Sequence, residues 1–430
     1  MKKLLFLFLL LPLLSMPSCV KEEDDLFGAS AAERMTQALK DYNAILNGAP
    51  NGWLMEYYSG DAGGFVYLCR FETLEGELSG DVTVASDLDI TETVTSLYEL
   101  KQDQSAVLTF NTYNAFLHYF AEPYDGNRVG LSGDYEFTFM KASADSVVLR
   151  GKKHGDRIVM TPFRGNDWQE YLQSLLAMQD QCSYGAFKLY AEGELVCPAE
   201  MDDYRWIRFY LGNTVIEQRF IYTLTGVKLY EPTKVGAVVY EYLDWDNAGM
   251  QFKCVGVDRG ELKTVIPEDY LLFAAYAGEW DFIYSTTATS PTRHTRPVTL
   301  VADGRTYRLE GLWADHPDRF LTLGYEKATG RLTLAPQIID VSGDNYINFA
   351  ALVVGEGSLW FGIHPKGQIG VWDMADRNNP RIEWIDAGYF PDPICGWILW
   401  LLDAQGNNAG QYMDELATDR RFVDIEMIKK

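Results

Sequence analysis

The sequence lacks the short motifs that identify most enzyme active sites. It has no Gly-x-Ser-x-Gly segment and no glycine-rich phosphate loop, which argues against a serine esterase or a nucleotidase. Its five histidines show no metal-ligand spacing such as His-Glu-x-x-His, so a zinc hydrolase is not expected. A glycoside hydrolase needs only two suitably spaced carboxylates, and no pair stands out among 61 acidic residues. We therefore expect no catalytic residue, no metal and no cofactor, and a glycoside hydrolase is the less favoured alternative.

Basic residues and cysteines are also scarce. The chain has 37 lysines and arginines against 61 acidic residues, a formal net charge of -24, which repels phosphate backbones and argues against nucleic-acid binding. Six cysteines without Cys-x-x-Cys spacing indicate neither a disulfide framework nor a zinc site. Cys182 and Cys197 could pair across a helix-to-strand connection, but buried free thiols are the favoured interpretation.

The N-terminus carries the clearest positive signal. Two lysines precede an apolar run over residues 4–14, which is too short to span a bilayer and is typical of a secretory signal peptide. Cys19 follows the small residue Ser18, and this order resembles the lipobox of bacterial lipoproteins, in which the thiol is acylated and becomes the mature N-terminus. We therefore expect residues 1–18 to be a signal peptide and Cys19 to carry the lipid.

An acidic segment follows this cysteine. Residues 21–25 read Lys-Glu-Glu-Asp-Asp, which resembles the export signal that sends Bacteroidetes lipoproteins to the outer face of the outer membrane. Four adjacent like charges cannot pack, so residues 19–29 are predicted to form a solvated tether, and a merely solubilising linker is the alternative. The resemblance implies a protein anchored to the outer membrane by its lipid and facing the cell exterior.

Aromatic residues are abundant, and the sequence pattern favours strands. They make up 14% of the chain, which suits both β-structure and sugar-binding surfaces, and composition cannot distinguish the two. A capping box at Ser30–Glu33 predicts a helix that ends near Asn47, and a second helix is predicted from Asn166 to about Gln181. Short strand-like runs separated by turns favour antiparallel pairing elsewhere. The expected fold class is mainly β (α+β): an antiparallel β domain with two packed helices, followed by an antiparallel β barrel or sandwich.

The chain is longer than a single core usually organises, so several domains are expected. We place an N-terminal helix-plus-β region at residues 30–265, with a division into two subdomains near 165–185 as an alternative. A connecting segment over 262–277 leads to the C-terminal β barrel or sandwich at 278–430.

Two tryptophans in polar turns are candidates for ligand binding. Trp245 lies between two aspartates and Trp313 precedes Ala-Asp-His-Pro-Asp, so both lie where hairpin loops are expected and their rings could be exposed. The apolar face of a sugar can stack on such rings while carboxylates and amides bind its hydroxyls. The favoured interpretation is nevertheless that each ring folds back over the end of a barrel. Residues 244–249 begin like a calcium loop, but Ala248 and Val255 occupy ligand positions, so a hairpin turn is favoured.

Several stretches resemble a family of Bacteroidetes lipoproteins. They are Gly52-Trp53 leading to Glu56-Tyr57-Tyr58, Gly63-Gly64-Phe65, Leu108-Thr-Phe-Asn-Thr-Tyr-Asn114, Gly133-Asp-Tyr-Glu-Phe137, and Val148-Leu-Arg-Gly-Lys-Lys153 before Met160-Thr-Pro162. This pattern resembles the lipoproteins grouped as domain of unknown function 4302, over roughly residues 30–260. The resemblance implies a cell-envelope lipoprotein and supplies no known active residues.

The sequence thus favours a cell-surface lipoprotein that captures glycans without catalysis. Surface lipoproteins of the Bacteroidetes commonly serve glycan capture, so this expectation rests on association rather than on a motif. The alternative is an envelope structural lipoprotein that binds a protein partner through its acidic surface or a strand edge. An enzyme, such as a glycosidase, is the least favoured of the three.

Overall fold

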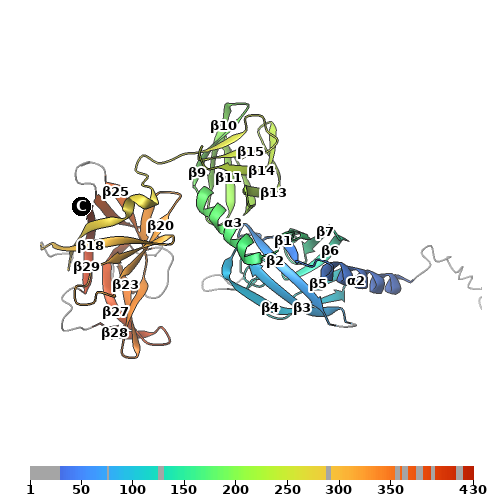
Figure 1. The fold of residues 1–430 in the computed structure, drawn as a ribbon, viewed down its shortest axis with the longest axis horizontal. Helices are drawn as coiled ribbons and strands as arrows, with labels where there is room; N and C mark the ends of the chain where they lie inside the picture. Colours follow the sequence, from blue (N-terminus) through green and yellow to red (C-terminus); the bar gives the residue numbers. More distant parts are fainter. Residues whose placement is uncertain are drawn as a thin grey trace, which may run out of the picture. The chain divides into compact units, whose positions relative to one another are not determined.

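The structure is a computed structural model that describes residues 30–74, 77–123, 130–286, 292–353, 359–360, 367–373, 381–388, 393–412 and 420–430. The predicted signal peptide, Cys19 and the predicted tether lie outside the described residues. Contacts divide the chain into two units, Met1–Leu175 and Leu176–Lys430. In the described part, strands dominate and only two α-helices occur (Figure 1), which confirms the expected mainly β class.

The first unit contains a closed barrel of antiparallel strands. Each strand pairs with the next one along the chain, and β1 pairs with β8 to close the ring. The strands are β1 (Trp53–Tyr58), β2 (Gly64–Thr73), β3 (Ser79–Ser86), β4 (Asp89–Gln102), β5 (Ala106–Thr109), β6 (Glu136–Ser143), β7 (Ser146–Gly151) and β8 (Arg157–Pro162). Inside the barrel, the ring of Tyr57 stacks at 5.0 Å on Tyr67 and at 5.6 Å on Phe120. The barrel interior is therefore a packed aromatic core.

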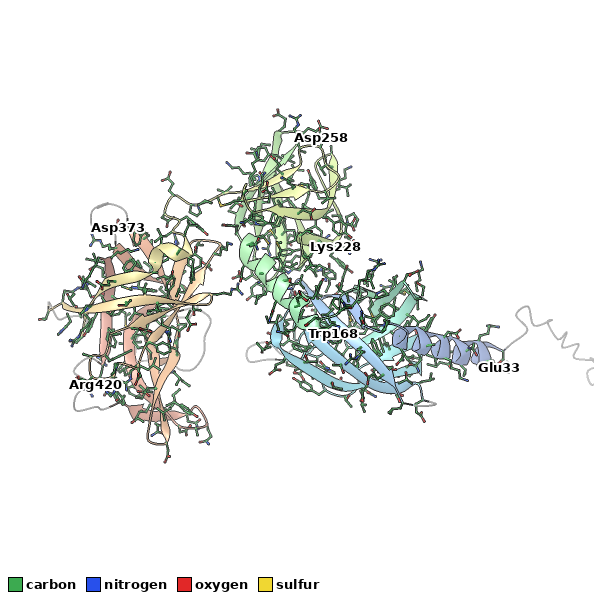
Figure 2. All side chains as sticks on the ribbon, in the orientation of Figure 1. Glu33, Trp168, Lys228, Asp258, Asp373 and Arg420 are labelled. Carbon is green, nitrogen blue, oxygen red and sulfur yellow. The ribbon has the colours of Figure 1, made fainter. Side chains whose placement is uncertain are left out.

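Helix α2 (Ala31–Asn47) packs against β2, β4, β5 and β6 of this barrel (Figure 1). It begins at the predicted capping box, in which the N–H of Glu33 (labelled in Figure 2) donates to Ser30 Oγ at 3.2 Å and the N–H of Ser30 donates to Glu33 Oε2 at 2.8 Å. Leu39 and Leu46 are buried on the side of the helix that faces the strands. The helix predicted from the sequence is confirmed.

A hydrogen-bonded polar group lies between α2 and the first barrel. The hydroxyl of Tyr98 donates to Asn43 Oδ1 at 2.8 Å and accepts from Asn47 Nδ2 at 3.1 Å. The hydroxyl of Thr73 lies 2.8 Å from the same phenol oxygen. The buried hydroxyl of Tyr98 therefore has hydrogen-bond partners on both the helix and a strand. This polar cluster joins the helix to the barrel.

Helix α3 (Trp168–Cys182) follows the first barrel. The Oδ1 of Asp167 accepts the N–H groups of Gln169 at 2.8 Å and Glu170 at 3.1 Å, so Asp167 is the N-cap. The second predicted helix is thereby confirmed. No helix in the described ranges combines the length and the apolar character that a membrane crossing would need.

The second unit begins with another closed barrel of antiparallel strands, whose ends β9 and β16 pair with each other. The strands are β9 (Ala186–Ala191), β10 (Glu194–Met201), β11 (Trp206–Leu211), β12 (Thr214–Tyr222), β13 (Gly226–Val235), β14 (Val238–Asp246), β15 (Gln251–Cys254) and β16 (Glu261–Thr264). Cys182, Cys197 and Cys254 are buried in this region as free thiols, as the sequence predicts.

The remainder of the second unit is one large antiparallel sheet preceded by a 3-10 turn, η2 (Phe273–Tyr276). Strands β17–β21, β25, β26 and β29 follow one another, and the pairing of β17 with β29 closes them into a ring. Their bounds are β17 (Gly278–Ser285), β18 (His294–Asp303), β19 (Thr306–Glu310), β20 (Leu321–Glu326), β21 (Arg331–Leu334), β25 (Gln368–Asp373), β26 (Arg381–Asp386) and β29 (Arg421–Lys429).

The other strands of this sheet extend from β29 through β27. They are β22 (Gln337–Ser342), β23 (Asn345–Val353), β24 (Leu359–Trp360), β27 (Ile394–Leu402) and β28 (Asn408–Gln411). In β17, the buried Trp280, Phe282 and Tyr284 alternate with less buried residues, the period of two that a strand with one core-facing side requires.

Candidate functional site

Trp245 lies near the end of β14 with a half-buried ring. The ring stacks on Tyr184 at 5.7 Å and meets the edge of Phe252 at 4.9 Å. Its indole N–H donates to Asn247 Oδ1 at 3.3 Å. The ring is therefore fixed on one side by Tyr184 and on another by Phe252.

The polar residues that follow Trp245 form a hairpin turn between β14 and β15. The Oδ1 of Asp246 accepts the N–H of Gly249 at 3.2 Å, and its Oδ2 pairs with Lys253 at 2.9 Å. The hydrogen bond from Lys253 lowers the pKa of Asp246. No group of three or more metal-ligating side chains occurs in the portion that the structure describes.

Trp313 does not have the exposed ring that its polar surroundings predict. Only 5% of it is exposed, and its ring meets Phe349 and Phe422 edge-on at 6.5 and 6.0 Å. The guanidinium of Arg319, itself buried, lies 5.7 Å from the ring centre and pairs with Asp340 at 2.7 Å. Trp313 is therefore wrong as an exposed ligand-binding candidate and agrees with the favoured interpretation that its ring folds back. The segment after β19 turns inward, so polar neighbours in the sequence surround a ring that belongs to the core.

The residue on which Trp245 stacks borders a hollow within the second unit. A cavity of about 490 Å³ is lined by Tyr184, Tyr222 and Tyr325. A cavity of about 290 Å³ shares Tyr184 and Tyr325 and adds Tyr270. Because the two cavities share wall residues, we treat them as one and call it the tyrosine hollow. Its aromatic and charged lining residues are Tyr184, Tyr222, Tyr270, Tyr325, Phe273, Arg305, Lys327, Asp180, Asp202, Asp203 and Glu326.

The tyrosines of the hollow are held in place by their own contacts. The hydroxyl of Tyr325 donates to the Leu271 carbonyl at 2.9 Å, and that of Tyr270 donates to the Lys327 carbonyl at 3.0 Å. The rings of Tyr184 and Tyr270 lie 6.3 Å apart. Burial raises the pKa of Tyr184 to about 12, so the phenol is neutral at physiological pH. The hollow therefore offers rigid, uncharged aromatic surface.

Fixed charges of both signs border these rings. The ammonium of Lys327 lies 4.9 Å from the centre of the Tyr184 ring and donates to the carbonyls of Asp180 and Gln181 at the end of α3. Arg305 pairs with the Asp180 carboxylate at 2.7 Å. Burial lowers the pKa of Lys327 and raises that of Asp180, which shows that both groups are partly withdrawn from water.

The groups that line the hollow offer both hydrogen bonds and apolar contacts. The lining residues of the two cavities include serine, threonine and tyrosine hydroxyls, carboxylates, an ammonium and a guanidinium, but neither histidine nor cysteine. Hydroxyls and charged groups of both signs can donate and accept hydrogen bonds, while the tyrosine rings pack against apolar surface. The arrangement can therefore hold a small ligand that carries hydroxyls around an apolar face.

Sequence reasoning missed most of this site. It selected Trp245, which supports the ring of Tyr184, but it did not select Tyr184, Tyr222 or Tyr325, which lie in or beside ordinary strands. Their convergence depends on segments far apart in the chain, and no local pattern signals it. Cys19, the predicted lipidation site, lies outside the described residues.

Two family matches cover most of the chain. Residues 23–247 match the family described as Domain of unknown function (DUF4302), and residues 256–400 match DUF4987, also described as a domain of unknown function. No curated protein matches the chain. A solved structure of the vaccine antigen Transferrin Binding Protein B from Haemophilus parasuis Hp5, a tryptophan-to-alanine mutant, is 8% identical over 88% of this chain and 74% of that one. Its TM-score of 0.14 is too low to support any argument about fold.

Proposed function

The chain belongs to the DUF4302 family, whose description assigns no activity, and we propose a function for it. In this proposal it is a cell-surface lipoprotein that captures glycans without catalysis. The tyrosine hollow carries the proposal, because it combines neutral aromatic rings with hydrogen-bonding groups around a cavity of about 490 Å³. That volume lies within the range of small-molecule sites. The lipid anchor at Cys19, expected from the sequence, would hold the protein in the outer membrane facing the exterior.

Saccharides suit the hollow for a chemical reason. Their hydroxyls are best bound by planar groups that can donate or accept in pairs, and Arg305, Asp202 and Asp203 are groups of this kind. Their C–H faces pack on aromatic rings such as Tyr184 and Tyr325. In this proposal Trp245 does not contact the ligand. It positions the ring of Tyr184 by stacking on it.

The test is calorimetric titration of the full chain, purified in detergent, against a panel of neutral and acidic oligosaccharides. We expect at least one ligand with a millimolar or lower Kd, and about a tenfold loss in Tyr325→Ala and Trp245→Ala, since ring truncations in binding sites commonly cost more than 1 kcal/mol. Tyr242→Ala is the control, because this 41% exposed tyrosine lies on the same strand as Trp245 and faces Lys228 (labelled in Figure 2).

A second readout does not depend on the folding of any variant. Ligand added to the unmodified chain should slow hydrogen exchange at amides of residues 179–184 and 324–328, which border the hollow. Absence of millimolar binding across the panel would count decisively against glycan capture. Binding without protection of these segments would move the site elsewhere.

A protein-partner role is the second candidate, and one observation favours it. Strand β22 ends the strand order of its sheet, and the apolar residues Ile338 and Val341 are 47% and 57% exposed there. Val341 pairs across the strands with Tyr346, which is 38% exposed. An exposed apolar strand at a sheet edge can accept a partner strand. Cross-linking from β22 on intact cells, with Val341→Lys as the disrupting variant, tests this candidate.

A further inference from the structure

The first barrel carries a separate aromatic surface in the connection between β5 and β6. The ring of His118 stacks on Tyr135 at 4.7 Å with an interplanar angle of 22°, and Tyr113 lies 5.5 Å from the same histidine. Tyr113 is 63% exposed and Tyr135 is 41% exposed. We call these three residues the tyrosine–histidine stack. No part of the tyrosine hollow contributes to it.

The segment beneath the stack is anchored firmly. Asn114 is fully buried, and its Oδ1 accepts the N–H groups of Phe116 at 3.1 Å and Leu117 at 3.2 Å. Phe116, Leu117 and Phe120 are buried in the barrel core. The connection between β5 and β6 is therefore packed into the core by these buried residues. The exposed rings are not needed to complete that core.

The histidine fixes the geometry of the exposed rings. The N–H of Asn114 donates to His118 Nδ1 at 3.2 Å, which orients the imidazole between the two tyrosines. The hydroxyl of Tyr113 donates to Glu122 Oε2 at 3.4 Å, which holds the outer ring at a second point. A ring ordered before binding loses little side-chain entropy when a ligand packs on it. The stack is therefore a preorganised binding surface.

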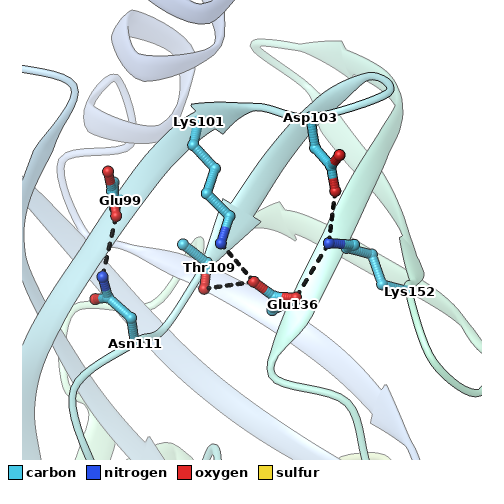
Figure 3. A network of polar contacts seen from close by, with 7 residues as sticks. All are labelled: Glu99, Lys101, Asp103, Thr109, Asn111, Glu136 and Lys152. Atoms are coloured by element: carbon cyan, nitrogen blue, oxygen red, sulfur yellow. Dashed lines mark hydrogen bonds and ion pairs between the residues drawn. The ribbon is translucent and has the colours of Figure 1, made fainter.

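A network of hydrogen-bonding groups lies on β4, on β6 and in the segment after β5 (Figure 3). Asn111 donates to Glu99 Oε2 at 3.0 Å, and Glu136 accepts from Lys101 at 2.6 Å and from Lys152 at 3.1 Å. These groups come from the segments next to Tyr113 and Tyr135, since β5 and β6 pair at Thr109 and Glu136. An amide and carboxylates that can bind hydroxyls are therefore close in sequence to the exposed rings.

The charges decide which ligand fits. Lys101 and Lys152 are already paired with Glu136, whereas the Glu122 carboxylate accepts a hydrogen bond from the exposed Tyr113. The whole chain carries a formal net charge of -24. An anionic polymer would meet like charge here, and a nucleic acid would be repelled for the same reason.

We propose that the tyrosine–histidine stack is a second, separate saccharide-binding surface that takes neutral rather than acidic glycan chains. Only the class of ligand rests on the proposed function; the site itself stands on the geometry of the first barrel. The exposed rings of the stack suit the interior of a long chain, whereas the hollow has the volume of a small-molecule site.

The experiment is affinity electrophoresis of the full chain in gels that contain laminarin, galactomannan, xyloglucan or polygalacturonate. We expect retardation by at least one neutral polysaccharide and none by polygalacturonate. Tyr113→Ala and Tyr135→Ala should each weaken retention about tenfold, as for truncated ring contacts in other interfaces. Tyr242→Ala is the matched control, because it is 41% exposed like Tyr135 but lies on the second barrel.

Substitutions of His118 test whether its ring positions the neighbouring tyrosines for binding. His118→Ala removes the ring that orders Tyr113 and should weaken retention, whereas His118→Phe keeps a stacking ring and should restore it. A merely structural role for His118 would instead lower the unfolding temperature of both variants without changing retention.

The outcomes separate this inference from the proposed function. Loss of retention in the stack variants with normal retention of Tyr325→Ala supports the stack as a site separate from the hollow. Normal retention of the stack variants overturns the stack. Stronger retention by polygalacturonate overturns the neutral class. No retention by any polysaccharide overturns the stack, and the hollow is then judged by the calorimetric titration alone.

Discussion

The first and second barrels share a topology but differ in how their interiors are completed. Both are closed meanders of antiparallel strands. The first barrel has the 14-residue strand β4 and a packed helix, α2, with a satisfied polar cluster around Tyr98. The second barrel has a smaller core, in which the buried hydroxyl of Tyr240 has no partner among the described residues. The same strand order therefore tolerates cores of different size and polarity, because closure depends on backbone pairing rather than on any one side chain.

The placement of aromatic residues differs in a way that bears on function. In the first barrel, large aromatic rings fill the interior, while Tyr113 and Tyr135 are exposed in the connection between β5 and β6. In the second, Tyr184 and Tyr222 belong to the edge of the core and also border the tyrosine hollow. A variant of Tyr113 can thus report on binding alone, whereas variants of Tyr184 combine binding with stability.

Removing a central ring from each barrel should have the largest effect. Trp53 is 1% exposed and donates from its indole to the Leu46 carbonyl at 2.7 Å, so Trp53→Ala should cost about 3–5 kcal/mol. Phe252→Ala, at a fully buried position on β15 of the second barrel, should cost a similar amount, about 3–5 kcal/mol. Hydrogen exchange should show lost protection in β1–β8 for the first variant and in β9–β16 for the second. Equal loss in both barrels from either variant would show that they unfold as one unit.

Deleting one phenol oxygen from each barrel sharpens the contrast in polarity. Tyr98→Phe leaves Asn43 and Thr73 without their shared partner and should cost about 1–3 kcal/mol. Tyr240→Phe removes a buried hydroxyl that has no partner in the described structure, so stability should stay unchanged or increase. The measurement is the urea midpoint of each variant. A loss in Tyr240→Phe as large as that in Tyr98→Phe would contradict the difference between the cores.

The smallest effect is expected at an ion pair on the first barrel. The hydrogen bond from Lys101 holds the pKa of Glu136 below its usual value, so its stabilisation is present above about pH 4.5 and is lost as the pH falls through the lowered pKa. Glu136→Gln should cost about 0.5 kcal/mol at pH 7 and nothing at pH 2. Glu231→Gln, on the second barrel, is the control, because this exposed glutamate has no ion-pair partner in the described residues. A penalty in Glu136→Gln that persists at pH 2 would rule out the ionic origin.

Helices were the part of the fold most readily predicted. Ser30 and Glu33 form the expected capping box, and Asp167 caps the second helix, because both signals act over two or three residues. Closure of the first two barrels was not predicted, whereas a barrel was one of the two forms predicted for the C-terminal region. The long strand β4 is largely polar and exposed over its first half, and β9 and β16 were not identified at all, so the partners that complete each ring were missing from the sequence pattern.

The candidate sites show the same division. Trp245 was selected from its polar turn and does lie in a hairpin, but Trp313 was selected by the same reasoning and is buried. Polar neighbours in the sequence do not decide exposure, since the direction in which a loop folds does. Tyr113 and Tyr135 also sit beside polar residues, yet their approach to His118 requires the pairing of β5 with β6.

The sequence by itself determined the mainly β class, the two helices and membership of a family without an assigned activity, and its N-terminus predicts a lipid anchor. Local signals suffice for these, because caps, alternation and short motifs act between near neighbours. Only the tertiary structure decided that the barrels close, that Trp313 is buried, and that Tyr184 and Tyr325 share a hollow. These features depend on contacts between residues tens to more than a hundred positions apart, which no local pattern encodes.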